Sequence, residues 1–310
     1  MSATVDILLA TYNGAAFLPE QLESIAAQTH GDWRLIARDD GSNDSTCAIL
    51  GEFRARLPNK VVLVEDAEKR LGAKHNFNRL MLRSDSAYVA FCDQDDIWLP
   101  NKLASLLDHS RKLKDLERPW LIHSDLTVVD ERNAVIAPSF WQYQFIRPKR
   151  CAWQQQLVQS IITGCAMLFN RALCQLARPI PVDAVMHDWW LGLIAATSGE
   201  ILWTNEATVR YRQHGRNDTG AKRWDLGHIK QQGQQELRSD HFGARMKVYR
   251  GQARALLAHR QVKIPEAVRN VIETFVNLDQ LSYLQRRRFL LKNGILKTGL
   301  LRNLAMLWVV

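Results

Sequence analysis

Short apolar runs alternate with amphipathic segments along the first third of the chain. The runs cover residues 5–10, 33–38, 61–64 and 88–92, and stretches with helical spacing lie between them at 17–29, 44–53 and 76–82. An apolar run of this length that stops at a turn signal is typical of a buried strand. Strands that alternate with helices predict an α/β fold with a mostly parallel central sheet flanked by helices.

The pattern changes toward the C-terminus. Residues 121–125 and 127–130 predict further strand, with a turn at 131–133, whereas Gln-rich and charged helical stretches without β-branched runs follow from about residue 222 to the end. We therefore expect two units, a sheet-based domain over residues 1–220 and a C-terminal α-helical region over residues 221–310.

Three carboxylates occur within four residues directly after the apolar run 88–92, at Asp93, Asp95 and Asp96. Clustered carboxylates at the end of a buried strand repel one another unless a cation neutralises them. Mg²⁺ and Mn²⁺ bind one or two carboxylates together with substrate phosphates. Residues 11–13 and 39–40 also follow predicted strands, and ligands of parallel sheets bind beyond the carboxyl ends of strands. The pattern therefore predicts a metal–diphosphate site at this edge.

The bulk properties fit a cytoplasmic protein. The N-terminus lacks a signal-peptide pattern, and no run approaches the roughly 18 apolar residues of a membrane-spanning helix. The five cysteines form no CxxC spacing, which is typical of structural thiols in a reducing compartment. The net charge of +9 fits nucleic acid, an anionic membrane surface or a phosphate-bearing substrate.

The last thirty residues are basic and apolar. No acidic residue follows Asp279, whereas six Lys and Arg residues stand among leucines, isoleucine and Trp308. This composition suits a helix that lies on the anionic inner face of a membrane. However, Arg288 and Lys292 share a helical face that Lys297 does not. Attachment to a membrane surface and an ordinary core-packing or oligomer helix both remain open.

Several segments together resemble a known family. Residues 5–13, 39–46 and the DxD motif within 93–96 look like the nucleotide-binding half of a family 2 glycosyltransferase with the GT-A fold. Residues 163–171 and 187–190 resemble its acceptor half, closest to the bacterial branch often assigned as rhamnosyltransferases of surface-polysaccharide and O-antigen biosynthesis. The resemblance spans roughly residues 4 to 220.

The resemblance implies a donor site. Asp40 is expected to accept a hydrogen bond from the N3–H of uracil or thymine, Asp93 to face the ribose or diphosphate, and Asp95 to bind Mn²⁺ or Mg²⁺. His214 is expected as a further metal or diphosphate ligand. The remaining implied donor-binding residues are Thr11, Tyr12, Asn13, Asp39, Lys74 and Asn76.

The resemblance also implies an acceptor site. Asp188 is the expected catalytic base, and Gly164, Trp189 and Trp190 are expected to contact the acceptor. One base and direct attack imply inversion at the anomeric carbon. The processive branch carries a QxxRW motif and transmembrane helices, which this sequence lacks. We therefore expect transfer of a single sugar, from dTDP-rhamnose or a UDP-sugar, to a glycan or lipid-linked oligosaccharide.

Two other classes remain as alternatives. A nucleotidyltransferase should carry a basic Gly-rich phosphate loop, but residues 11–14 contain one Gly and no basic residue. A basic nucleic-acid-binding protein should line one groove with cations and aromatic residues. Here the strongest basic run lies in the apolar tail, and the clustered carboxylates would repel phosphates without a metal, so no nucleic-acid partner is expected.

Overall fold

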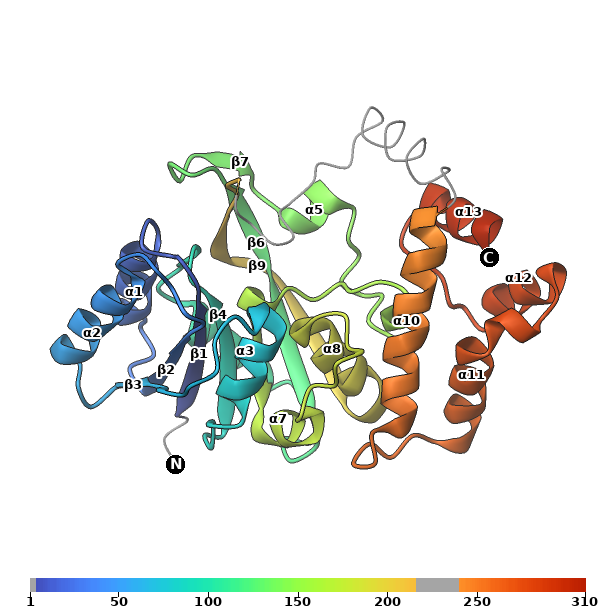
Figure 1. The fold of residues 1–310 in the computed structure, drawn as a ribbon, viewed down its shortest axis with the longest axis horizontal. Coiled ribbons are helices and arrows are strands. Elements are labelled where there is room, and N and C mark those ends of the chain that lie inside the picture. The colour runs from blue at the N-terminus through green and yellow to red at the C-terminus, as the bar shows by residue number, and fades with distance from the viewer. Residues whose placement is uncertain (1–3, 216–239) are drawn as a thin grey trace.

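A sheet of nine strands organises the part of the chain that this computed structural model describes, residues 4–215 and 240–310 (Figure 1). Its strands follow one another in the spatial order β3-β2-β1-β4-β8-β6-β9-β5, and β7 pairs with β6. Their bounds are β1 (Val5–Thr11), β2 (Trp33–Asp39), β3 (Val61–Leu63), β4 (Tyr88–Asp93), β5 (Ile97–Trp98), β6 (Trp120–Val129), β7 (Val135–Ala137), β8 (Met167–Asn170) and β9 (Glu200–Arg212).

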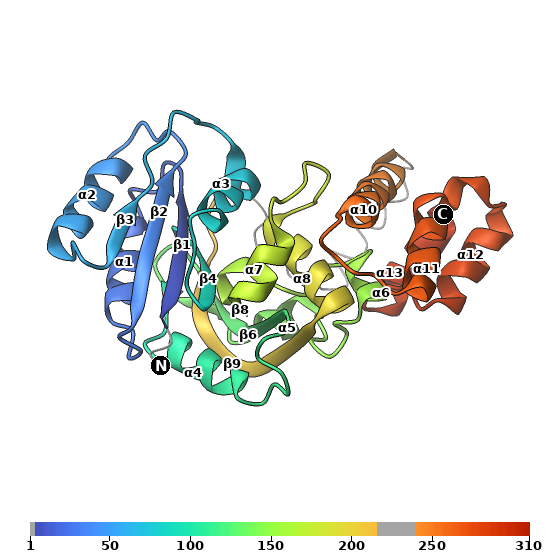
Figure 2. The ribbon, with the colours of Figure 1, turned by 90° about the horizontal axis from the view of Figure 1, so that it is seen from below.

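Helices cover both faces of the sheet and continue beyond it (Figure 2). The first eight are α1 (Leu18–Ala26), α2 (Thr46–Arg56), α3 (Gly72–Met81), α4 (Lys102–Ser110), α5 (Phe140–Gln144), α6 (Trp153–Gln156), α7 (Arg171–Ala177) and α8 (His187–Ser198). The others are α10 (Asp240–Ala258), α11 (Glu266–Val276), α12 (Tyr283–Lys292) and α13 (Leu300–Val309), with short 3-10 turns at Gly164–Ala166 and Leu278–Gln280.

The predicted α/β fold is confirmed, and its sheet is mixed. Strands β1, β2, β3 and β4 form a parallel half. Strand β8 then runs antiparallel to both β4 and β6, while β6 and β9 pair in parallel and β5 joins β9 antiparallel. Hydrophobic periodicity reports burial and not strand direction, which is why the sequence alone did not reveal the reversal.

The parallel half is apolar because it is buried on both faces. Along β1, Ile7 and Leu9 face a core formed with α1, α2 and α4, whereas Leu8 between them faces a second core formed with α3, α7 and α8. All three side chains are fully buried. Each β1 residue therefore packs against one of the two helical layers.

The C-terminal helices extend the second core away from the parallel half. Tyr249, Ala253 and Leu256 of α10 are buried with Ile272 and Phe275 of α11. Helices α12 and α13 lie at the far end of the molecule from β3 (Figure 1). The boundary predicted near residue 220 lies outside the described residues. Among the helices of the described ranges, none is both long and apolar enough to cross a bilayer.

The parallel register brings three polar segments to one edge of the sheet. Thr11 at the end of β1 is level with Asp39 of β2, and Ala10 is level with Asp93 of β4. The segments that follow these strands therefore share the edge at which the sequence predicts a ligand site.

Candidate active site

A cavity of about 630 Å³ opens at this edge. It is lined by eight of the predicted site residues, Thr11, Tyr12, Asp40, Asn76, Asp93, Asp95, Gly164 and Asp188. The lining also includes residues that the sequence analysis missed, among them Arg70, Phe77, Gln94, Met186, His187 and Tyr211. Four carboxylates from three different segments thus meet in one space large enough for a nucleotide sugar.

Gln94 fastens the loop after β4 to the loop after β1. Its amide oxygen accepts a hydrogen bond from the Tyr12 N–H at 2.8 Å, and its amide nitrogen donates to the Tyr12 carbonyl at 2.9 Å. A Cβ on Gly14 would lie 2.2 Å from the same amide oxygen, so glycine there leaves room for the Gln94 side chain. Asn13, with φ 47°, binds the backbone of Asn43 instead of lining the cavity.

The end of β2 uses two adjacent carboxylates differently. Asp39 accepts hydrogen bonds from Thr11 Oγ1 and from the backbone of Gly41 and Ser42. Burial alone would raise the pKa of Asp39, but the bonds from Ser42 and Thr11 lower it overall. Asp39 is therefore a turn residue that holds the shape of the edge.

Asp40 faces the cavity although its side chain is almost fully buried. It accepts hydrogen bonds from the backbone N–H groups of Leu71 and Gly72 at 3.0 and 2.8 Å. The buried Arg38 guanidinium binds both Asp40 and Asn76, each at 3.1 Å. These contacts fix Asp40 and Asn76 against α3 at one end of the cavity.

Residues at and after the end of β9 contact the loop that follows β4, residues 93–96, which we call the carboxylate loop. His214 Nε2 lies 2.7 Å from Asp95 Oδ2, and its ring stacks on Phe17 with centroids 4.8 Å apart. Arg212 donates from its side chain to the Asp95 carbonyl at 2.9 Å and from its backbone to Asp96 Oδ1 at 3.1 Å. Residues more than a hundred positions apart therefore form one unit.

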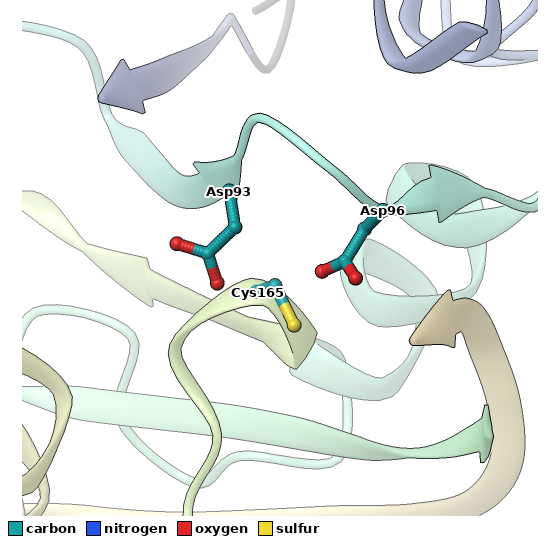
Figure 3. Close-up of side chains that lie close together, drawn as sticks. All are labelled: Asp93, Asp96 and Cys165. Carbon is teal, nitrogen blue, oxygen red and sulfur yellow. The ribbon is translucent and has the colours of Figure 1, made fainter. Parts of the chain in front are cut away.

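The acidic cluster offers ligand atoms of different kinds to a divalent cation. Asp93, Asp96 and Cys165 place ligand atoms within 4.8 Å of one another, and Figure 3 shows Asp93 and Asp96 pointing toward Cys165. Burial, followed by the charges of Asp96 and Asp93, raises the pKa of the Cys165 thiol well above its usual range. A protonated sulfur does not suit a hard ion. Asp93 and Asp95 line the cavity and offer carboxylate oxygens, the ligand type that Mn²⁺ and Mg²⁺ prefer, and His214 lies beside Asp95.

Asp188 stands on the other side of the cavity, at the first turn of α8. Its oxygens accept hydrogen bonds from the N–H of Gly164 at 3.0 Å and of Trp189 at 2.7 Å. Burial raises its pKa to about 6. A Cβ on Gly164 would lie 2.9 Å from His187 Nε2 and 3.4 Å from Asp188 Cβ, so glycine allows this approach. The result is a carboxylate made more basic in a wall of the cavity.

Three predicted site residues point elsewhere. Trp190 is fully buried and donates to the Ala177 carbonyl at 2.8 Å, and Trp189 donates to the Gln156 carbonyl at 2.5 Å. Lys74 Nζ donates to the carbonyls of Val182 and Ala184 at 2.6 and 2.8 Å. The structure therefore gives both tryptophans a packing role behind Asp188, and it uses the Lys74 ammonium to hold the loop before α8.

Some missed residues left a signal in the sequence and others did not. Arg70 precedes Gly72 in a basic turn, has φ 61° and places a cation in the lining of the cavity. His187 directly precedes Asp188. Its ring stacks on the Phe77 ring with centroids 4.0 Å apart, and burial lowers its pKa to about 3. The contacts of Arg212 could not be predicted from the residues next to it in the sequence, because they depend on how β9 pairs in the sheet.

Two curated glycosyltransferases are similar to this chain in sequence. The sequence of the chain is 27% identical over 224 residues to the dTDP-rhamnosyl transferase RfbG of Shigella flexneri, covering 69% of this chain and 74% of the relative. It is 33% identical over 170 residues to the Escherichia coli UDP-Glc:alpha-D-GlcNAc-diphosphoundecaprenol beta-1,3-glucosyltransferase WfgD, covering 54% of this chain and 61% of the relative.

Solved structures share the fold. Residues 1–349 of Staphylococcus aureus TarS in complex with UDP match with a TM-score of 0.55 and 16% identity, covering 93% of this chain and 75% of that one. The mannosyltransferase PcManGT of Pyrobaculum calidifontis in complex with GDP-Man and Mn²⁺ matches with a TM-score of 0.54 and 17% identity, covering 94% and 72%.

The family comparison covers more than half of the chain. The sequence model described as "Glycosyl transferase family 2" matches residues 6–176 of the 310. This segment holds the ends of β1, β2 and β4, which lie at one side of the cavity. The chain therefore belongs to glycosyl transferase family 2.

Proposed function

We propose that this glycosyltransferase is a metal-dependent, inverting and non-processive enzyme that moves one sugar from a nucleoside-diphosphate donor to a glycan or lipid-linked acceptor in polysaccharide biosynthesis. The observation that carries the proposal is the placement of Asp188 across one cavity from Asp93 and Asp95. Because the chain belongs to this family, we prefer glycosyl transfer to the two alternatives, nucleotidyl transfer and nucleic-acid binding.

The proposed chemistry follows from the two sides of the cavity. Asp188 takes the proton of the acceptor hydroxyl as the new bond to the anomeric carbon forms and the bond to the diphosphate breaks. Its pKa of about 6 leaves it mostly ionised at neutral pH and more basic than an exposed aspartate. A bound Mn²⁺ or Mg²⁺ would neutralise the departing diphosphate. Asp95 and His214 would hold that ion, with Asp93 beside it.

The proposed donor carries a uracil or thymine base. Asp40 Oδ2 accepts one backbone hydrogen bond, which leaves it capacity to accept another from a ring N–H. The names of two relatives, a dTDP-rhamnosyl transferase and a UDP-Glc glucosyltransferase, support dTDP-rhamnose or a UDP-sugar. Arg70, which lines the same cavity, would add a positive charge toward the diphosphate.

The proposed setting is cytoplasmic. All five cysteines are free thiols, which suits a reducing compartment. The name of the second relative includes a diphosphoundecaprenol acceptor, which supports a lipid-linked acceptor here.

The proposal is tested by calorimetric titration of the purified chain with UDP, dTDP, GDP and ADP, each with Mn²⁺ and with EDTA. We expect one pyrimidine diphosphate to bind, and only with the metal. The matched variants are Asp95→Asn, which should need more Mn²⁺ for this binding, and Asp108→Asn, which removes an exposed charge on α4 and should bind as the wild type does. Equal binding in EDTA would refute the metal requirement, and binding of GDP or ADP alone would refute the assignment of Asp40.

A further inference from the structure

Helix α13 turns an apolar face outward. Leu300, Leu301, Leu304 and Trp308 are 75%, 50%, 54% and 68% exposed. At about 100° per residue, these four positions lie within an arc of about 100°. Single exposed leucines are ordinary, but a contiguous apolar face on one helix marks an interaction surface.

Helix α12 adds cations to the same end of the molecule. Leu284, Arg288, Leu291 and Lys292 follow a helical spacing that places them on one face, and all four are exposed. Arg287 joins the two helices, because its guanidinium lies 3.0 Å from the centre of the Tyr283 ring and donates to the Trp308 carbonyl at 3.0 Å. We call these two exposed faces together the α12–α13 surface.

The charged residues of the stretch that forms this surface all have one sign. Residues 280–310 contain six Lys and Arg residues and no Asp or Glu. The nearest preceding carboxylate, Asp279, is bound to Arg250 at 2.6 Å. Arg288 and Lys292 therefore extend from an apolar surface without an acidic side chain in this stretch to balance them. An anionic partner that also accepts leucine and tryptophan fits both properties.

We propose that the α12–α13 surface docks on an anionic membrane. Leucine and tryptophan side chains would enter the boundary between headgroups and acyl chains, and Arg288 and Lys292 would lie on lipid phosphates. Both helices have ten residues, so they would lie in the plane of the interface instead of crossing it. A symmetric pairing with a second copy fits less well, because it would place like charges against each other.

Docking here would leave the donor side of the cavity in water. Strands β1, β2 and β4 lie at the opposite end of the molecule from α12 and α13 (Figures 1 and 2). The inference rests on the surface alone and is independent of the proposed donor and metal. It would still explain how a glycosyltransferase meets an acceptor that is held in a membrane.

The test is sedimentation of the full chain with vesicles of phosphatidylcholine, alone or mixed with phosphatidylglycerol. We expect the wild type to bind the mixed vesicles and to be released by salt. The double variant Leu304→Ser/Trp308→Ser should bind the mixed vesicles at least about tenfold more weakly than the wild type. Arg288→Gln/Lys292→Gln should lose the preference for phosphatidylglycerol.

Control variants remove two exposed apolar side chains or two positive charges elsewhere on the molecule. Val135→Ser/Ile136→Ser changes two exposed residues of β7, and Lys112→Gln/Lys114→Gln changes two exposed lysines after α4. Both should bind vesicles as the wild type does, with unchanged circular dichroism in every variant. Equal binding by the α12–α13 variants and their controls, or no binding by the wild type, would overturn the proposal. So would dimerisation in analytical ultracentrifugation that Leu304→Ser/Trp308→Ser abolishes, since a second copy would then occupy the surface.

Discussion

The two sides of the cavity hold carboxylates in contrasting ways. On the donor side, Asp40 is bound by two backbone N–H groups and the Arg38 guanidinium, and Gln94 ties the neighbouring loops together. On the other side, Asp188 is held by two backbone N–H groups, and burial raises its pKa to about 6. In the proposed function, this contrast separates recognition, which needs a fixed charge, from proton transfer, which needs a basic one.

Among the variants that test this contrast, we expect Asp188→Asn to have the largest effect on turnover. The amide keeps the shape of the side chain but cannot accept the acceptor proton, so we expect turnover to fall roughly 100- to 10,000-fold. Binding of the donor nucleotide, measured by calorimetry, should stay unchanged. Asp183→Asn, an exposed carboxylate five positions earlier, should retain full turnover. Normal turnover in Asp188→Asn would assign the base elsewhere.

The donor side is tested by Asp95→Asn. This change removes a charge that faces the cavity and weakens the contact with His214, so we expect the metal requirement to rise and turnover to fall by roughly 100-fold. Titration of Mn²⁺ at fixed donor concentration measures the shift. An unchanged metal dependence would mean that Asp95 is not a ligand.

The pH dependence of turnover sharpens the assignment of Asp188. Because the base must be ionised and its pKa is raised to about 6, turnover should be near its plateau at pH 7 and fall about tenfold per unit well below pH 6. The measurement is kcat under saturating donor and metal from pH 5 to pH 8. A rate that stays flat down to pH 5 would contradict the assignment.

The smallest expected effect belongs to Gln94→Ala. It removes two hydrogen bonds to Tyr12 while leaving every carboxylate in place, so donor affinity should weaken about fivefold. The dissociation constant of the pyrimidine diphosphate measures this, and kcat at saturating donor should change little. Gln142→Ala, on the partly exposed α5, is the control and should have no effect.

The sequence predicted the elements whose signals are local. Apolar runs followed by polar clusters located β1, β2 and β4, and a parallel register then placed Thr11, Asp40 and Asp93 at one cavity. Long-range pairing was not predictable, since Arg212 reaches the loop after β4 only through the alignment of β9 with β5 and β6.

Side-chain direction was also beyond the sequence. Trp189, Trp190 and Lys74 stand in suggestive motifs, but each donates to a backbone carbonyl away from the cavity. The reverse holds for α13, because its pattern shows an apolar face without showing what covers it. Only the exposure of Leu300 and Trp308 distinguishes an outward face from an inward one.

The position of β9 decides where this chain can be divided. The family match ends at residue 176, yet β9 lies between β6 and β5 in the sheet and carries Arg212 to the carboxylate loop. A fragment cut at the end of the match would expose one edge of β6 and leave β5 without its neighbour, which invites aggregation. On the ribosome, too, Asp95 lacks this hydrogen-bond partner until His214 has emerged.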